Sequence, residues 1–151
     1  MAFHLILARS EGFGATVVEF LVGAVLAISI GVSATFVGLD RDRAFYPTVM
    51  IVIASYYALF AVMGGSAHAL AIESIVIVAF LGASIAGFRT SLWLVVAALA
   101  GHGLFDFIHG HLIVNPGVPA WWPPFCLSYD VAAAAYLAWL LSQSRVRATA
   151  T

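Results

Sequence analysis

Five long apolar stretches constrain the fold of this chain more than any other feature of its sequence. Each has roughly the 17–25 residues that a helix needs to cross the hydrocarbon core of a bilayer. They are expected at residues 16–39, 45–63, 67–88, 90–114 and 125–141. Backbone groups in lipid must be hydrogen-bonded within the protein, so we predict an all-α fold, a polytopic bundle of five transmembrane helices.

The composition of the chain and the position of its prolines agree with this prediction. Of the 151 residues, 64% are hydrophobic and only 9% are charged, whereas soluble domains carry about 25% charged residues. The chain has no basic patch, which argues against a nucleic-acid partner. Four prolines fall between residues 115 and 124, and this Pro/Trp-rich segment is predicted to be a loop. A single transmembrane domain over residues 1–151 is expected, with the lipid bilayer as its surroundings.

The arginines predict the orientation of the bundle. With five spans, five arginines fall on one side and only Arg9 falls on the other; the five are Arg41, Arg43, Arg89, Arg145 and Arg147. Positive charge accumulates on the cytoplasmic side of membrane proteins. We therefore expect the N-terminus outside, the C-terminus in the cytoplasm and the 115–124 loop on the outer side. The expected location is a cell membrane, of the bacterial inner-membrane type, with several crossings.

A polar stripe on the fourth predicted helix is the main candidate for a functional site. His102, Asp106 and His109 are spaced i, i+4 and i+7, which places them within roughly 60° of arc on one helix face. Ionisable groups at membrane depth are costly, and their presence there indicates a functional site. His111 lies about 180° from His102 around an ideal helix, so it joins this face only if the helix unwinds near Gly110.

Acidic residues in other spans are predicted to lie at a similar depth. Asp106 is expected roughly 10 Å from the outer end of its helix, Glu73 and Asp130 roughly 8–9 Å, and Glu19 roughly 5 Å. Cys126 and Asp130 are spaced i, i+4 and share a face of the fifth helix. We therefore expect one polar cavity that opens to the outer side, with the fourth helix as its main wall.

These residue types suit a metal ion. His102, Asp106, His109 and Asp130 are the predicted ligands, and such a nitrogen-and-oxygen set suits zinc, iron or manganese. One divalent ion, zinc or iron, is the cofactor that the pattern indicates. Asp130 and Glu73 are the candidate catalytic residues, as general bases toward a metal-activated water.

A structural interpretation of the same residues stays open. Histidine and aspartate within membranes also pair with each other, or with backbone groups, to hold helices together. On this interpretation His68 lies at the interface, Cys126 is a buried apolar thiol, and Tyr56 and Tyr57 are packing residues.

The region from about residue 100 to 131 resembles an uncharacterised family of small bacterial integral membrane proteins. The shared features are His-x-x-x-Asp-x-x-His at 102–109 on the penultimate helix, a proline-rich outer loop, and Cys126-x-x-x-Asp130. This chain has Gly110 and then His111 where the family often has a second histidine directly after the motif. A fainter similarity runs to the ceramidase and adiponectin-receptor group, which binds zinc through histidines and an aspartate but has seven spans. That similarity concerns the type of site alone.

Two functions from different classes follow. The first is a metal-dependent membrane hydrolase or oxidase that acts on a lipid or isoprenoid molecule. The second is a non-catalytic membrane protein, either a ligand or metal-ion binder or an accessory subunit, in which the His/Asp/Glu layer serves helix packing. A transporter fits less well, because the cytoplasmic halves of the spans lack ionisable residues. The sequence specifies no oligomeric state.

Overall fold

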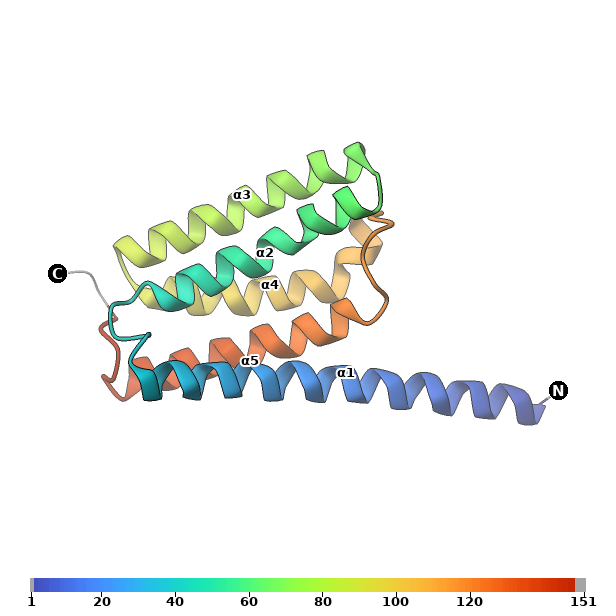
Figure 1. The fold of residues 1–151 in the computed structure, drawn as a ribbon, viewed down its shortest axis with the longest axis horizontal. Helices are drawn as coiled ribbons and strands as arrows, with labels where there is room; N and C mark the ends of the chain where they lie inside the picture. Colours follow the sequence, from blue (N-terminus) through green and yellow to red (C-terminus); the bar gives the residue numbers. More distant parts are fainter. Residues whose placement is uncertain (1, 149–151) are drawn as a thin grey trace.

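The computed structural model describes residues 2–148, with side chains from residue 17 onward. It contains five α-helices (Figure 1): α1 Ala2–Val37, α2 Phe45–Met63, α3 Ala67–Arg89, α4 Leu92–Leu112 and α5 Trp122–Ser142. All five contain a segment long and apolar enough to cross a membrane; in α1 it is Val17–Val37. The predicted all-α fold with five candidate spans is therefore confirmed.

The helices run alternately up and down, so the connections gather at the two ends of the bundle. Figure 1 shows the α2–α3 turn and the α4–α5 loop at one end, and the α1–α2 loop, the α3–α4 turn and the C-terminal segment at the other. The second end carries Arg41, Arg43, Arg89, Arg145 and Arg147, and we call it the inner end, following the orientation that these arginines predict. The first is the outer end, beyond which the N-terminal part of α1 extends. The side chain of Arg9 lies outside the described residues.

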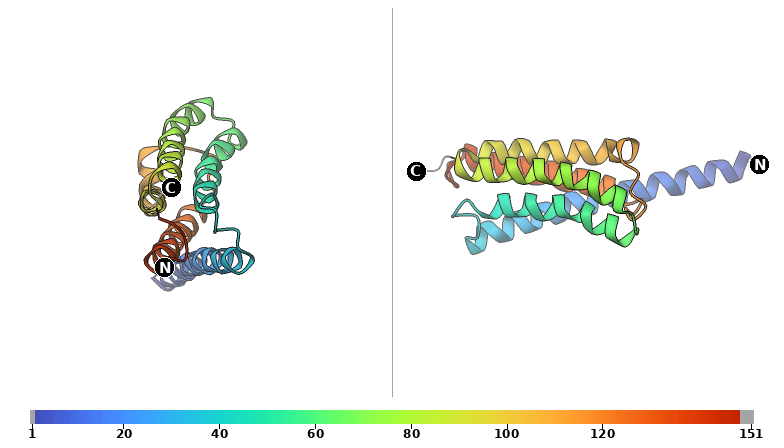
Figure 2. Two further views of the ribbon diagram at one scale, coloured as in Figure 1. Left: turned by 90° about the vertical axis from the view of Figure 1, so that its left-hand side faces the viewer. Right: turned by 90° about the horizontal axis from the view of Figure 1, so that it is seen from above.

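The helices pack as a series of neighbours that is not closed on one side. α1 packs mainly on α5, α5 on α4, α4 on α3, and α3 on α2, with a smaller contact between α2 and α4. The end-on view in Figure 2 shows this arrangement, with α1 beside α5. α1 packs on α5 and not on α2, although α2 follows it directly in the sequence. The side of the bundle between α1 and α2 is therefore less tightly packed.

Large apolar side chains lie on both the inside and the outside of the bundle. Met50, Leu92, Leu99 and Leu137 are completely buried where α2, α4 and α5 meet. Many others are exposed, including Phe107, as expected where the surrounding solvent is hydrocarbon instead of water.

Arg43 fastens the inner end. Its guanidinium donates hydrogen bonds to the backbone oxygens of Phe88 (2.8 Å) and Arg147 (2.7 Å), so the α1–α2 loop is tied to the end of α3 and to the C-terminal segment. Burial lowers the pKa of this guanidinium. Free carbonyls at a helix C-terminus are favourable partners for a cation. Arg43 therefore stabilises the contact between the α1–α2 loop and the end of α3.

Two helices begin three or more residues earlier than predicted, whereas the other boundaries differ by at most two residues. α5 begins at Trp122, three residues earlier than expected, with prolines at its first positions. Proline is tolerated there because the first N–H groups of a helix have no intrahelical partner. The segment of four prolines therefore divides between a loop and the first turn of α5. α1 extends back to Ala2, whereas the expected span began at residue 16.

Candidate metal centre

A close approach of α4 and α5 brings the polar residues of the two helices together. Gly103 lies on α4 at this contact, where an added Cβ would come within 3.2 Å of the Asp130 Cβ and of the Leu127 backbone oxygen. That spacing is tighter than a side chain ordinarily accepts, so glycine allows the two backbones to approach. The neighbouring His102 side chain consequently reaches the carboxylate of Asp130.

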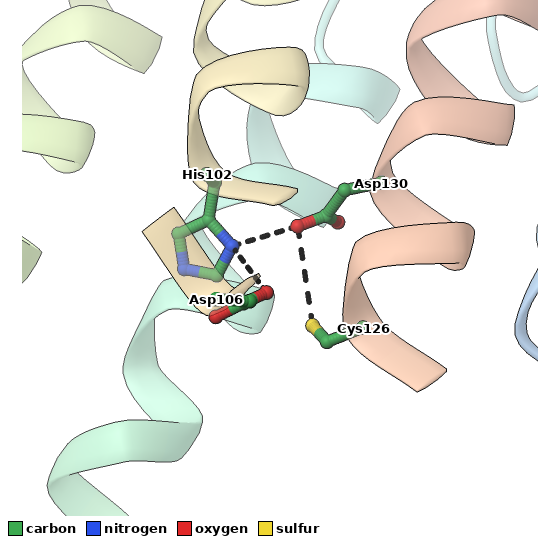
Figure 3. A group of neighbouring side chains, drawn as sticks. All are labelled: His102, Asp106, Cys126 and Asp130. Atoms are coloured by element: carbon green, nitrogen blue, oxygen red, sulfur yellow. Dashed lines mark hydrogen bonds and ion pairs between the residues drawn. The ribbon is translucent and has the colours of Figure 1, made fainter. Parts of the chain in front are cut away.

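Four side chains from the two helices form what we call the four-residue cluster: His102, Asp106, Cys126 and Asp130 (Figure 3). The Nδ1 atom of His102 lies 2.7 Å from Oδ2 of Asp130 and 3.3 Å from Oδ2 of Asp106. The Cys126 thiol donates to the same Asp130 oxygen over 3.9 Å. One potential ligand atom from each residue lies within 4.8 Å of those of the other three. The cluster thus gathers one nitrogen, one sulfur and two carboxylate donors.

The cluster is buried and its hydrogen bonding is incomplete. None of its four side chains is more than 2% exposed. Among the residues that the structure describes, Oδ2 of Asp106 and Oδ1 of Asp130 have no hydrogen-bond partner. In the tautomer that carries a proton on Nδ1, His102 can donate well to only one carboxylate, and the 2.7 Å contact favours Asp130 over Asp106. Buried carboxylate oxygens without partners are costly, so two acceptor atoms remain for a ligand.

The spacing of the donor atoms fits a small cation. Metal–ligand distances of about 2.0–2.3 Å in a tetrahedral zinc site put neighbouring donors roughly 3.3–3.8 Å apart. The His102–Asp106 separation of 3.3 Å lies at the lower end of that range, and the Cys126–Asp130 separation of 3.9 Å lies just above its upper end. The His102–Asp130 contact of 2.7 Å is a hydrogen-bond length, and it would lengthen by roughly 0.6 Å if an ion replaced the shared proton.

Tyr57 of α2 supports the cluster from a third helix. Its hydroxyl donates a 2.5 Å hydrogen bond to Oδ1 of Asp106, and the tyrosine is almost completely buried. Such a partner fixes the orientation of a ligating carboxylate and is part of how metal sites hold their geometry. Oδ2 of Asp106 is thereby directed toward His102.

His109 and Glu73 form a second polar group, which we call the Glu73–His109 pair. The Nε2 atom of His109 lies 2.7 Å from Oε1 of Glu73. Asn115 donates to the same oxygen over 3.0 Å and to the backbone oxygen of Tyr57 over 3.1 Å. The Tyr57 ring stacks on His109 with 4.1 Å between ring centroids. Glu73, His109 and Asn115 thus satisfy one another's hydrogen bonds. These bonds join α2, α3, α4 and the α4–α5 loop.

The structure therefore divides the predicted site residues into two groups. His102, Asp106 and Asp130 come together as expected, whereas His109 is paired with Glu73. The predicted polar cavity open to the outer side is not what these residues form. Their side chains are at most 2% exposed because they bond to one another and fill the space between the helices.

The remaining polar candidates lie apart from the two groups. His68 and His111 are exposed, and their position at the membrane interface stays a prediction. α4 continues through Gly110 to Leu112, so His111 stays on the far face of the helix. Glu19 is half-buried on α1.

Three residues of the two polar groups were missed or undervalued at the level of sequence. Cys126 belongs to the cluster, and its i, i+4 spacing to Asp130 was the available signal. Tyr57 was interpreted as a packing residue, although a tyrosine within a span also carries a hydroxyl that needs a partner. Asn115 was placed in a loop, and nothing in the sequence indicates that its amide reaches Glu73.

No family model, curated protein or solved structure matches this chain. The fold and the site by themselves define the class: a five-helix membrane protein with a buried His/Asp/Cys cluster that could hold a metal ion.

Proposed function

We propose that this protein is a multi-pass membrane metalloprotein in which His102, Asp106, Cys126 and Asp130 bind one divalent ion, zinc by preference. The observation that carries the proposal is the convergence of four potential ligand atoms within 4.8 Å, two of them on carboxylates that each retain an unpartnered buried oxygen. The mixed nitrogen, oxygen and sulfur set favours zinc over iron or manganese, because thiolate is a preferred zinc ligand.

Charge balance supports the same proposal. Asp106 and Asp130 together carry two negative charges when ionised, and His102 offers at most one positive charge. Unbalanced charge within a bilayer is expensive. With Cys126 bound as a thiolate the cluster carries three negative charges, and a divalent ion offsets two of them, whereas a protonated imidazole offsets only one. The Glu73–His109 pair needs no ion, since one acid and one base balance each other.

With a water molecule as an additional ligand beside the four side chains, such an ion would supply the activation of that water near neutral pH. Asp130 is then placed to act as general base, because its Oδ1 atom is unpartnered. Glu73 fits that role less well, since its Oε1 atom already accepts from His109 and Asn115. We infer that the activity is hydrolysis of an ester or amide bond in a lipid, in a cell membrane of the bacterial inner-membrane type.

A second candidate function is supported by the bonds that already exist. The His102–Asp130 and His109–Glu73 contacts, both 2.7 Å, each join two helices, as in membrane proteins whose polar residues serve packing alone. On this alternative the whole polar layer is structural and no ion binds.

Metal analysis of the purified protein tests the proposal. The full chain is expressed, purified in mild detergent and analysed for metals by mass spectrometry, and its thermal unfolding is recorded before and after treatment with a chelator. We expect close to one zinc per chain and a lower unfolding temperature after chelation, because an ion that binds only the folded state stabilises it.

The Asp106→Asn variant provides the control for the site. It should bind less zinc and lose most of the effect of the chelator while remaining helical by circular dichroism. A metal-free wild type whose unfolding temperature does not change with added zinc would refute the metal site and favour the packing alternative.

A further inference from the structure

A lateral groove opens on the side of the bundle between α1 and α2, with α5 as its floor. Its volume is about 400 Å³, within the roughly 300–1,000 Å³ typical of small-molecule pockets. The groove contains no charged side chain among those that line it. Its lining includes Leu26 and Ile30 from α1, Val52 and Tyr56 from α2, and Trp122 and Phe125 from α5.

The groove is elongated along the helices. On α2 its lining begins at Phe45, the first residue at the inner end, and reaches Tyr56, a distance of about 16 Å at 1.5 Å per residue. All of these residues belong to helices that are long and apolar enough to span a membrane. An apolar groove of this length and direction matches a single extended hydrocarbon chain that lies parallel to the chains of the bilayer.

The outer end of the groove carries a hydrogen-bond donor without a partner. Trp122 lines the groove and is only 8% exposed, yet its indole Nε1 has no partner among the described residues. The ring of Tyr56 lies 4.9 Å from it between centroids. A buried indole N–H normally finds an acceptor, and the carbonyl oxygen of an ester at the membrane interface would supply one.

Cys126 connects the groove to the four-residue cluster. It lines the groove, and its thiol donates to Asp130 on the other side. It lies four residues, or about 6 Å along α5, from Trp122. A carbonyl group that binds at Trp122 would therefore lie about one helical turn from the candidate metal ligands.

We propose that this groove binds one acyl chain of a bilayer lipid, with the ester group of that lipid beside Trp122 and Cys126. The proposal deepens the proposed function by naming the substrate class, an acyl ester. Chain binding itself needs only the shape and the apolar lining of the groove, so it can be tested apart from the metal.

Photolabelling in a bilayer tests the groove. The full chain is reconstituted into phosphatidylcholine vesicles that contain a phosphatidylcholine with a diazirine midway along one acyl chain, irradiated and mapped by peptide mass spectrometry. We expect labels to concentrate several-fold on groove residues such as Leu26 and Phe125, relative to exposed residues on α3 such as Ile75.

Two matched valine substitutions provide the variant test. Val52 lies in the groove and is 50% exposed, whereas Val78 on α3 is 64% exposed and faces away from it. Val52→Trp should fill the groove and remove most labelling of Phe125, and Val78→Trp should leave it unchanged. Because both positions are already exposed to lipid, neither change inserts bulk into the core.

Three results separate this proposal from the metal proposal. If the Asp130→Asn variant loses metal but keeps the labelling pattern, the groove stands independently of the ion. If the wild type binds metal but labels evenly over all its exposed faces, the groove proposal fails while the metal site survives. If groove residues stay free of lipid label and the purified chain runs as a stable dimer in detergent, the occupant is a second copy of this chain and the lipid proposal is refuted.

Discussion

Two groups of histidine and carboxylate side chains lie along α4, about two helical turns apart. In the Glu73–His109 pair, acid and base match one to one, and the amide of Asn115 completes the bonding. In the four-residue cluster, two carboxylates face a single histidine, and each keeps an oxygen without a partner. Similar residue types on neighbouring parts of the same helix thus build one self-sufficient contact and one incomplete site.

The difference shows what separates packing from ligand binding inside a membrane. A matched pair lowers the cost of burying its charges and joins helices, and nothing further is needed for its stability. A cluster with surplus negative charge and unused acceptors is stable only when something else supplies positive charge. Counting donors against acceptors is therefore more informative than noting that ionisable residues lie in a span.

The largest expected effect comes from removing one carboxylate charge from the four-residue cluster, and the same change in the Glu73–His109 pair is its control. Asp130→Asn should lower zinc affinity by at least about 100-fold, which is the upper end of the range for residues that only support a ligand. The matched change Glu73→Gln should leave zinc affinity nearly unchanged. Competition titration with a fluorescent zinc chelator measures both, and equal losses in the two variants would contradict the division into two groups.

An intermediate effect is expected from the residue that links the groups. Tyr57→Phe removes the hydroxyl that holds Asp106 but keeps the ring that stacks on His109. Loss of such a supporting hydrogen bond should weaken zinc binding about tenfold. The same titration tests this change, and thermal unfolding in the presence of chelator serves as the control for packing. An unchanged zinc affinity would show that Asp106 is oriented by other contacts.

A smaller effect is expected for the pair itself, on stability instead of metal binding. Glu73→Ala and His109→Ala should each destabilise the fold, and a double-mutant cycle should give a coupling energy of about 1 kcal/mol, as found for hydrogen bonds between membrane helices. Unfolding in mixed detergent micelles measures the cycle. Zero coupling would mean that the 2.7 Å contact contributes nothing to packing.

The smallest effect is expected at an exposed histidine. His111 lies on the same helix as both groups but faces outward, so His111→Ala should change zinc affinity by less than about twofold, within the ordinary range for surface substitutions. A large loss of zinc upon this change would place the ion at the outer end of α4, away from the four-residue cluster.

Much of the fold could be predicted from the sequence because membrane-spanning helices are recognised by their length and apolar composition. The bounds of α2 were predicted at residues 45–63, as observed. The segments that carry five of the six arginines were predicted to lie at one end of the bundle, and they do. The start of α5 could not be placed, because prolines signal a loop and a first helical turn equally well.

The residues of the candidate site on α4 were predictable, but their pairings were not. Helix periodicity places His102, Asp106 and His109 on one face, but a face about 60° wide can meet two different neighbouring helices. His102 meets α5 and His109 meets α3, and only the packing order of the helices decides this. The position of the Tyr57 hydroxyl likewise depends on the rotation of α2, which a nearly uniform apolar sequence leaves undetermined.

The metal content of two histidine variants tests the central claim most directly. His102→Ala and His109→Ala are purified in parallel with the wild type, and zinc per chain is measured by mass spectrometry for samples that retain their helical circular dichroism. The four-residue cluster predicts close to one zinc in the wild type and in His109→Ala, and almost none in His102→Ala. Zinc retained in His102→Ala, or lost equally from both variants, would contradict the assignment.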